Sequence, residues 1–160
     1  MNLFLINLFL ALGFAVVIGE FSLTLLLTGF AIGYAALWAT SPLYGKAGGA
    51  YFAKVRNVLA LVAYFIWELV SSNFRVLWDV VTPSHISKPG IIGVRLDART
   101  DFEVMTVANL ISLTPGSLSL DLSADRRTLY VHVMFLDDPE KVRKQIKEGF
   151  EKRTLEAIRS

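Results

Sequence analysis

Charged side chains are distributed very unevenly along this sequence of 160 residues, and that distribution limits the possible folds more than any other feature. The chain has 16 basic and 14 acidic residues, yet only seven of them precede residue 81. With 54% hydrophobic residues and a mean hydropathy of +0.51, an ordinary soluble or disordered chain is excluded. The sequence therefore predicts a membrane-embedded first half joined to a water-soluble second half.

Three apolar runs in the first half are long enough to cross a bilayer as helices. They cover about residues 2–19, 21–40 and 57–78. At about 1.5 Å of rise per residue, each of the first two reaches roughly 27–30 Å, the thickness of a hydrocarbon core. Glu20 separates the first two runs, and Glu68 interrupts the third. We therefore expect three transmembrane helices.

The ends of these runs carry little information on topology. The Gly19-Glu20 step is the expected hairpin tip, because a carboxylate costs less at the headgroups than at mid-bilayer. A cleaved signal peptide is disfavoured, because no Lys or Arg precedes Lys46. With three spans, the basic loop that contains Lys46 lies opposite the C-terminal domain, which itself begins with Lys88. Charge therefore leaves the orientation undecided.

A few residues inside the runs could carry function. Gly29 and Gly33 have the small-xxx-small spacing that lets another helix approach closely, although such spacing also occurs by chance. Glu68 shares a helical stripe with Tyr64 and Ser72. The carboxylate could belong to a proton or cation relay, or it could make a structural hydrogen bond to a neighbouring helix. We favour the structural interpretation, because the other spans offer no partner acid.

The segments around the third run are expected to be less regular. Pro42 and the glycine-rich stretch 45–49 predict a flexible loop before it. Arg75 and Asp79, four residues apart, are expected to form a surface ion pair. Pro83 is expected to end the helix.

The second half alternates between strand and helix signals. Residues 91–97, 117–122 and 129–135 alternate apolar and polar side chains, as strands do. Thr100 and Glu103 have the spacing of a capping box ahead of an amphipathic helix that should end before Pro115. Asp137, Pro139 and Glu140 are expected to open a last helix, in which Val142, Ile146 and Phe150 repeat every four residues.

This order predicts a small two-layer βαββα domain, with both helices on one face of a three-stranded sheet. Its first two strands should run parallel, joined by a right-handed crossover. The fold class is thus membrane α-helical plus α/β. The expected divisions are a transmembrane region over 1–81, a linker over 82–90 and the soluble domain over 91–160.

The uncovered face of the sheet is the main candidate surface of the soluble half. It should carry Arg95, Tyr130 and His132, and it is either solvated or a docking surface. His132 is more simply an ordinary sheet residue than a ligand or base, because the sequence has only two histidines and no cysteine. We expect no metal, no cofactor and no catalytic set. Basic and acidic residues interleave, which disfavours a nucleic-acid partner.

The helix before the second strand ends in a distinctive turn. Thr114 precedes a proline and is pushed out of the helical region, Pro115 fixes φ, and Gly116 permits a positive φ. Asn109 could satisfy carbonyls freed at this helix end. The turn is either a plain connection or a docking corner for a partner.

Several of these strings, in this order, match a known family. They are Gly29-Phe30-Ala31-Ile32-Gly33-Tyr34 before Trp38, Trp67-Glu68-Leu69-Val70-Ser71-Ser72-Asn73, Pro89-Gly90-Ile91, Ala108-Asn109-Leu110-Ile111-Ser112-Leu113-Thr114-Pro115-Gly116-Ser117 and Leu129-Tyr130-Val131-His132. Along nearly its whole length the chain resembles the E subunit of the Mrp multisubunit Na⁺/H⁺ antiporters, also called Mnh or Pha. The family usually has Thr at Ser112 and Ser117, a difference that keeps the hydroxyl.

The resemblance implies a bacterial or archaeal plasma-membrane complex that exchanges sodium for protons and supports salt and alkali tolerance. It implies that ion-conducting groups lie mainly in larger subunits, so this chain would be accessory, with those subunits and the lipid bilayer as partners. It also implies a cytoplasmic C-terminal domain. With three spans, the basic loop around Lys46 then faces outward, against the positive-inside rule.

Two functions follow as hypotheses. The first is an accessory subunit that supports assembly of the antiporter. The alternative is a free-standing, membrane-tethered module that binds a ligand or a protein through its open sheet face. A membrane enzyme would need a base near a nucleophile in a water-excluding pocket, and the sequence suggests no such set.

Overall fold

The computed structural model describes residues 3–83 and 85–160, apart from the side chains of residues 45–48. The first residue of the expected span 2–19 lies outside this part. The chain divides into two compact units between Arg56 and Asn57. This division falls earlier than the one expected from the sequence, because the helix after Arg56 packs on the C-terminal domain.

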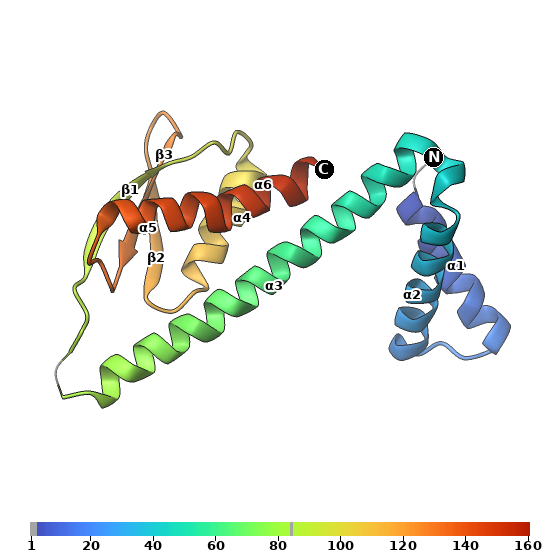
Figure 1. Cartoon of the computed structure of the whole chain (residues 1–160), viewed down its shortest axis with the longest axis horizontal. Helices are drawn as coiled ribbons and strands as arrows, with labels where there is room; N and C mark the ends of the chain where they lie inside the picture. The colour runs from blue at the N-terminus through green and yellow to red at the C-terminus, as the bar shows by residue number, and fades with distance from the viewer. Residues whose placement is uncertain (1–2, 84) are drawn as a thin grey trace. The chain divides into compact units, whose positions relative to one another are not determined.

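The first unit contains a hairpin of two apolar helices, α1 (Leu3–Ile18) and α2 (Leu23–Ala39) (Figure 1). Between them Gly19 has φ +78°, a conformation that glycine adopts without strain. The Ser22 side chain accepts a hydrogen bond from the Leu25 N–H and caps α2. The turn therefore forms at the predicted Gly19-Glu20 step.

The segment after α2 is helical, so the predicted flexible loop is wrong. A short 3₁₀ turn, η1 (Ser41–Tyr44), leads into α3 (Gly45–Val81), a helix of 37 residues. The rings of Tyr51 and Phe52 lie 5.9 and 5.2 Å from the ring of Tyr34, measured between centroids. These aromatic contacts hold the first turns of α3 against α2.

Among the described helices, one segment, Gly49–Val81, is long and apolar enough to cross a membrane. Helices α1 and α2 are apolar but shorter, with 16 and 17 residues. The architecture is thus helical with a small sheet, and three transmembrane helices remain a prediction.

The second unit contains a three-stranded sheet in the order β1-β3-β2. Its strands are β1 (Gly90–Arg95), β2 (Ser117–Leu122) and β3 (Thr128–Val133). Both β1 and β2 pair antiparallel with β3, so they run parallel to each other. The predicted direction of the first two strands is confirmed, and β3 lies between them.

Helix α4 (Asp101–Ser112) begins at the predicted capping box. The Thr100 hydroxyl accepts from the Glu103 N–H at 3.2 Å, and the Glu103 carboxylate accepts from the Thr100 N–H at 3.2 Å. The helix ends before Pro115, as the proline requires.

The C-terminal helix is continuous but changes its winding along its length (Figure 1). It consists of α5 (Pro139–Gln145), a π-helical turn η2 (Ile146–Glu151) and α6 (Lys152–Arg159). Asp138, rather than the expected Asp137, caps it by accepting from the N–H groups of Glu140 and Lys141. Pro139 follows at the first helical position, where its missing N–H costs nothing.

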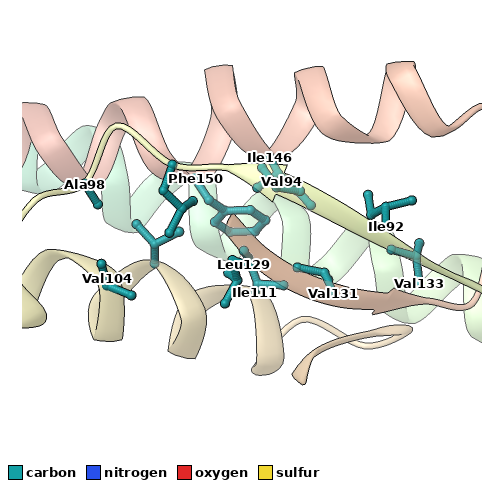
Figure 2. Packing of buried hydrophobic residues seen from close by; sticks show 12 residues of the cluster. Ile92, Val94, Ala98, Val104, Ile111, Leu129, Val131, Val133, Ile146 and Phe150 are labelled. Carbon is teal, nitrogen blue, oxygen red and sulfur yellow. The ribbon is translucent and has the colours of Figure 1, made fainter. Parts of the chain in front are cut away.

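The core lies between the sheet and the two helical segments that cover one of its faces (Figure 2). The strands β1 and β3 contribute Ile92, Val94, Leu129, Val131 and Val133, and the helices contribute Val104, Val107, Ile111, Ile146 and Phe150. The last two were predicted from the four-residue repeat. Helices therefore cover the face of β1 and β3 that the alternation assigned to the core. In β2 the alternation is reversed, because Leu118 and Leu120 are about half exposed on the open face and the Ser119 hydroxyl donates to the Ala108 carbonyl of α4.

A candidate helix docking site

One face of α3 packs on the small domain, and its residues include the polar stripe predicted to lie in the membrane. The ring of Tyr64 meets the ring of Phe150 edge to face, with centroids 5.3 Å apart. The Arg153 guanidinium lies over the ring of Tyr64, 4.3 Å from its centroid. Tyr64 therefore has both an apolar and a cationic partner on the C-terminal helix.

Gly149 makes this close approach possible. A Cβ atom built on Gly149 would collide with the hydroxyl and the ring carbon bearing it on Tyr64. Gly149 is buried inside the π-helical turn. The close approach of Tyr64 thus gives a packing reason for a glycine inside this helix.

Glu68 continues the same face one turn further along. Its two carboxylate oxygens accept from the Gln145 side-chain amide at 3.2 and 3.4 Å. Ser72, another turn on, is 8% exposed, and the Arg75 guanidinium lies 5.9 Å from the centroid of Phe135. Glu68 therefore faces a polar partner in the water-soluble domain instead of a neighbouring membrane span.

The turn after α4 lies against this stripe. Residues Thr114 to Ser117, with Gly116 at φ +84°, line a pocket of about 70 Å³ together with Glu68, Ser72 and Arg75. Such a volume holds a few water molecules and is well below the ~300 Å³ of small ligand sites. The two motifs singled out in the sequence thus meet, and they meet as a packing contact.

Hydroxyl groups satisfy the carbonyls at the end of α4. Thr114 Oγ1 donates to the Leu110 carbonyl at 2.9 Å, and Ser117 Oγ donates to the Ile111 carbonyl at 2.7 Å. Ser112 Oγ accepts from the Ser119 N–H at 3.0 Å. The side chain of Asn109 is exposed, so the helix end relies on hydroxyls and not on this amide as expected.

Contacts at both ends complete what we call the docking stripe, made of Asn57, Tyr64, Glu68, Ser72, Arg75 and Asp79. At one end Asn57 Nδ2 donates to the carbonyl of Glu156 at 3.2 Å. At the other, the buried Asp79 carboxylate accepts from the Ile86 and Ser87 N–H groups at 2.5 and 2.9 Å. The predicted surface pair of Arg75 and Asp79 is wrong, because each side chain turns to a partner outside the helix.

A buried polar cluster fixes the C-terminal helix to the rest of the domain. Glu151, 1% exposed, accepts from the N–H groups of Asp97 and Ala98 and pairs with Lys147 at 2.9 Å. Lys147 also pairs with Asp97 at 2.7 Å, and this charged hydrogen bond lowers the pKa of Asp97. The C-terminal helix on which α3 packs is therefore anchored to the segment that follows β1.

A second anchor lies at the end of the chain. Arg159 donates to both carboxylate oxygens of Glu103, at 2.8 and 3.0 Å. This pair, aided by the N–H groups of Arg99 and Thr100, lowers the pKa of Glu103 to about 2. The capping residue of α4 thus also holds the end of α6.

In the first unit, Gly29 and Gly33 lie where α2 meets α1. A Cβ at Gly29 would come within 3.1 Å of the Ala11 backbone, and one at Gly33 would collide with the Asn7 side chain. Asn7 is fully buried and donates to the Tyr51 hydroxyl at 3.0 Å. The glycine face therefore packs against a helix of the same chain.

The open face of the sheet lies on the other side from the helices, so Arg95, Tyr130 and His132 do not join the docking stripe. His132 pairs in register with Ile91 and Leu118, both largely exposed. Within residues 3–83 and 85–160, no group of three or more His, Cys, Asp or Glu side chains is placed to hold a metal ion. The face around His132 is thus partly apolar.

Sequence reasoning missed several of the residues that build these contacts. Asn7 is a polar residue inside an apolar run, and Gly149 is a glycine inside a helical pattern, so both gave a signal. Glu151 and Gln145 look like ordinary helix-surface residues. Their roles depend on the π-helical turn, which no local pattern announces.

Comparison with known proteins agrees with the sequence motifs. The model of a family described as Na⁺/H⁺ ion antiporter subunit matches residues 7–157. The E subunit of the Na⁺/H⁺ antiporter of Bacillus subtilis (strain 168) is 33% identical over 155 residues, which cover 97% of each chain. The corresponding E subunit of Alkalihalophilus pseudofirmus is 35% identical over 109 residues, 68% of this chain and 69% of that one.

Two solved structures are also similar. A chain of the Mrp complex from Dietzia sp. DQ12-45-1b is 26% identical with a TM-score of 0.51, over 64% of this chain and 96% of that one. A chain of an archaeal membrane-bound sulfane sulfur reductase complex, at 23% identity, shares the fold with a TM-score of 0.57 over 96% and 98% of the two chains. The protein therefore belongs to the family of Na⁺/H⁺ antiporter E subunits.

Proposed function

We propose that this chain is an accessory subunit of a multisubunit Na⁺/H⁺ antiporter, which supports assembly of the complex and thereby cation and pH homeostasis. The relatives named above are antiporter subunits, and one similar structure comes from an Mrp complex. The subunit works within the cell membrane, in contact with lipid and with the other subunits. It carries out no reaction of its own.

The observation that carries the accessory role is the position of Glu68. A proton path through a membrane is built from chains of Asp, Glu or His side chains. Glu68 instead accepts from Gln145, in a contact that holds α3 to the small domain. The turn from Thr114 to Gly116 lines the same small pocket as Glu68 and so belongs to this contact. We infer that both motifs set the geometry in which the subunit meets its partners.

The topology belongs to the same proposal. The chain is a multi-pass membrane protein in which α1 and α2 cross the bilayer and the small domain faces the cytoplasm. The third span expected over 57–78 corresponds to the part of α3 that carries the docking stripe. The alternative of a free-standing binding module finds no support in the relatives, which are subunits of antiporters.

Replacing Glu68 in a strain that lacks the native subunit tests this role. Glu68→Ala removes the acceptor for Gln145, whereas Glu68→Gln keeps a neutral one. We expect the amount of assembled complex to fall with Ala and to fall less with Gln, with Na⁺/H⁺ exchange per assembled complex unchanged. The control Glu140→Ala removes an exposed carboxylate of the same domain, paired only with Arg143 at the surface. Full assembly with lost exchange would place Glu68 in the ion path.

A further inference from the structure

Helix α3 has a second face, opposite the docking stripe, that is uniformly apolar. Six side chains at helical spacing form it, each 45–67% exposed: Leu59, Ile66, Val70, Phe74, Leu77 and Val81. The one polar side chain beside them, Asn73, donates to the carbonyl of Leu69 in its own helix at 2.7 Å. This apolar face can therefore be buried in an apolar environment without leaving a polar side chain unpaired.

The docking stripe determines whether this part of α3 can cross a bilayer. Its contacts with the small domain run from Asn57 to Arg75, about 27 Å of helix, which is close to the thickness of a hydrocarbon core. The domain surface along this length has exposed charges at Glu148, Lys152 and Glu156. A crossing helix would bring these charges into lipid, at a few kcal/mol each.

The apolar face fits a lipid surface. Trp67 and Trp78 flank it and are 69% and 63% exposed, and tryptophan is favoured at the headgroup level. Of the two acids of this part of the helix, Glu68 turns to the small domain and Asp79 to the linker N–H groups of Ile86 and Ser87, so neither lies on the apolar face. Lys54 and Arg56, just before it, are exposed. An apolar face with tryptophans, near exposed cations, is typical of a helix on an anionic membrane surface.

We propose that α3 from Asn57 to Val81 lies along the membrane surface, with its apolar face on lipid and its docking stripe on the small domain. The chain then crosses the bilayer twice, through α1 and α2. The basic residues Lys54 and Arg56 come to lie on the same side as the small domain, which agrees with the positive-inside rule if that side is the cytoplasm. The conflict created by three spans disappears. The inference rests on the proposed membrane function.

The three tryptophans of the chain, one of them Trp38 in α2, provide the test. Variants of the full chain that retain one tryptophan each, with Phe at the other two positions, are placed in anionic phospholipid vesicles. Fluorescence quenching is measured with lipids brominated near the headgroup or near the end of the acyl chain. A crossing helix separates Trp67 and Trp78 by about 16 Å in depth, whereas a helix in the plane leaves both at one depth.

We expect headgroup-proximal bromines to quench Trp67 and Trp78 equally and more strongly than deep ones. A deep Trp67 with a shallow Trp78 would overturn the surface position, and so would two tryptophans that no lipid quenches. If the fluorescence of Trp38 is not quenched by any brominated lipid either, the proposed membrane function itself is refuted. A second readout uses tags at the two termini: both on one side of the membrane fits two crossings, and opposite sides contradict it.

Discussion

Adding one methyl group at Gly149 tests the docking of α3 most sharply. In a helix without neighbours, Gly→Ala stabilises the chain by about 0.5–1 kcal/mol, because alanine loses less backbone entropy on folding. At Gly149 the new methyl group collides with Tyr64, whose ring must then leave its place. The sign of the effect therefore depends on whether α3 is docked as described.

The contacts of Tyr64 give the magnitude. Its edge-to-face contact with Phe150 contributes about 0.5–1.5 kcal/mol. Its cation–π contact with Arg153 contributes about 0.5–1 kcal/mol. Losing both outweighs the helix propensity of alanine, so Gly149→Ala should destabilise the chain by up to about 2 kcal/mol. In a Tyr64→Ala background the collision is gone, and the same change should stabilise by about 0.5–1 kcal/mol.

Thermal unfolding of the detergent-solubilised chain measures both backgrounds, where 1 kcal/mol corresponds to about 2–4 °C. Gly13→Ala in α1 is the matched control, because a Cβ there meets no atom within 4 Å, and it should raise the midpoint slightly in either background. An equal rise of the midpoint for Gly149→Ala with and without Tyr64 would show that α3 is not docked at Gly149.

Three further changes address other parts of the structure. The folded-state pKa of Glu103, about 2, lies below its ordinary value of 4.5. The ionised Glu103 therefore contributes its full stabilisation above pH 4.5, and this stabilisation is lost as the pH falls towards 2. In Glu103→Gln, the free energy of unfolding should no longer fall over this pH range, which acid unfolding curves measure. Gly33→Ala should loosen the α1–α2 hairpin through its collision with Asn7, seen as faster proteolysis in detergent than for Gly13→Ala, and equal rates would contradict the packing. Ser117→Ala removes the hydroxyl donor that lies within hydrogen-bond distance of the Ile111 and Thr114 carbonyls, and should cost about 1 kcal/mol. Ser117→Thr keeps the hydroxyl and should be nearly neutral; equal midpoints for the two variants would speak against this role.

Local patterns were sufficient where a few neighbouring residues determine the structure. The capping box at Thr100 and Glu103, the Gly19 turn and the alternation of β1 and β3 each act within one turn or one strand pair. Hydrophobic periodicity likewise identified Ile146 and Phe150 as core residues. These features could therefore be predicted before any tertiary contact was known.

The surroundings of α3 could not be predicted in this way. An apolar run with one carboxylate looks the same whether lipid or a protein domain lies beside the carboxylate. Apart from the hydrogen bond between Tyr64 and Glu68 themselves, the partners of these two residues are 77 or more residues away, at Gln145, Phe150 and Arg153. The π-helical turn that places Gly149 and Glu151 has no sequence signature. The sequence therefore indicated the right residues at the docking stripe but not what they touch.

The mass at which the tagged chain migrates after gentle solubilisation of its native membranes tests the account most directly. An accessory antiporter subunit is expected at a mass far above its own 17.8 kDa, together with large hydrophobic partner chains. Migration alone, or at a small multiple of its own mass without other chains, would contradict the account and favour a free-standing module.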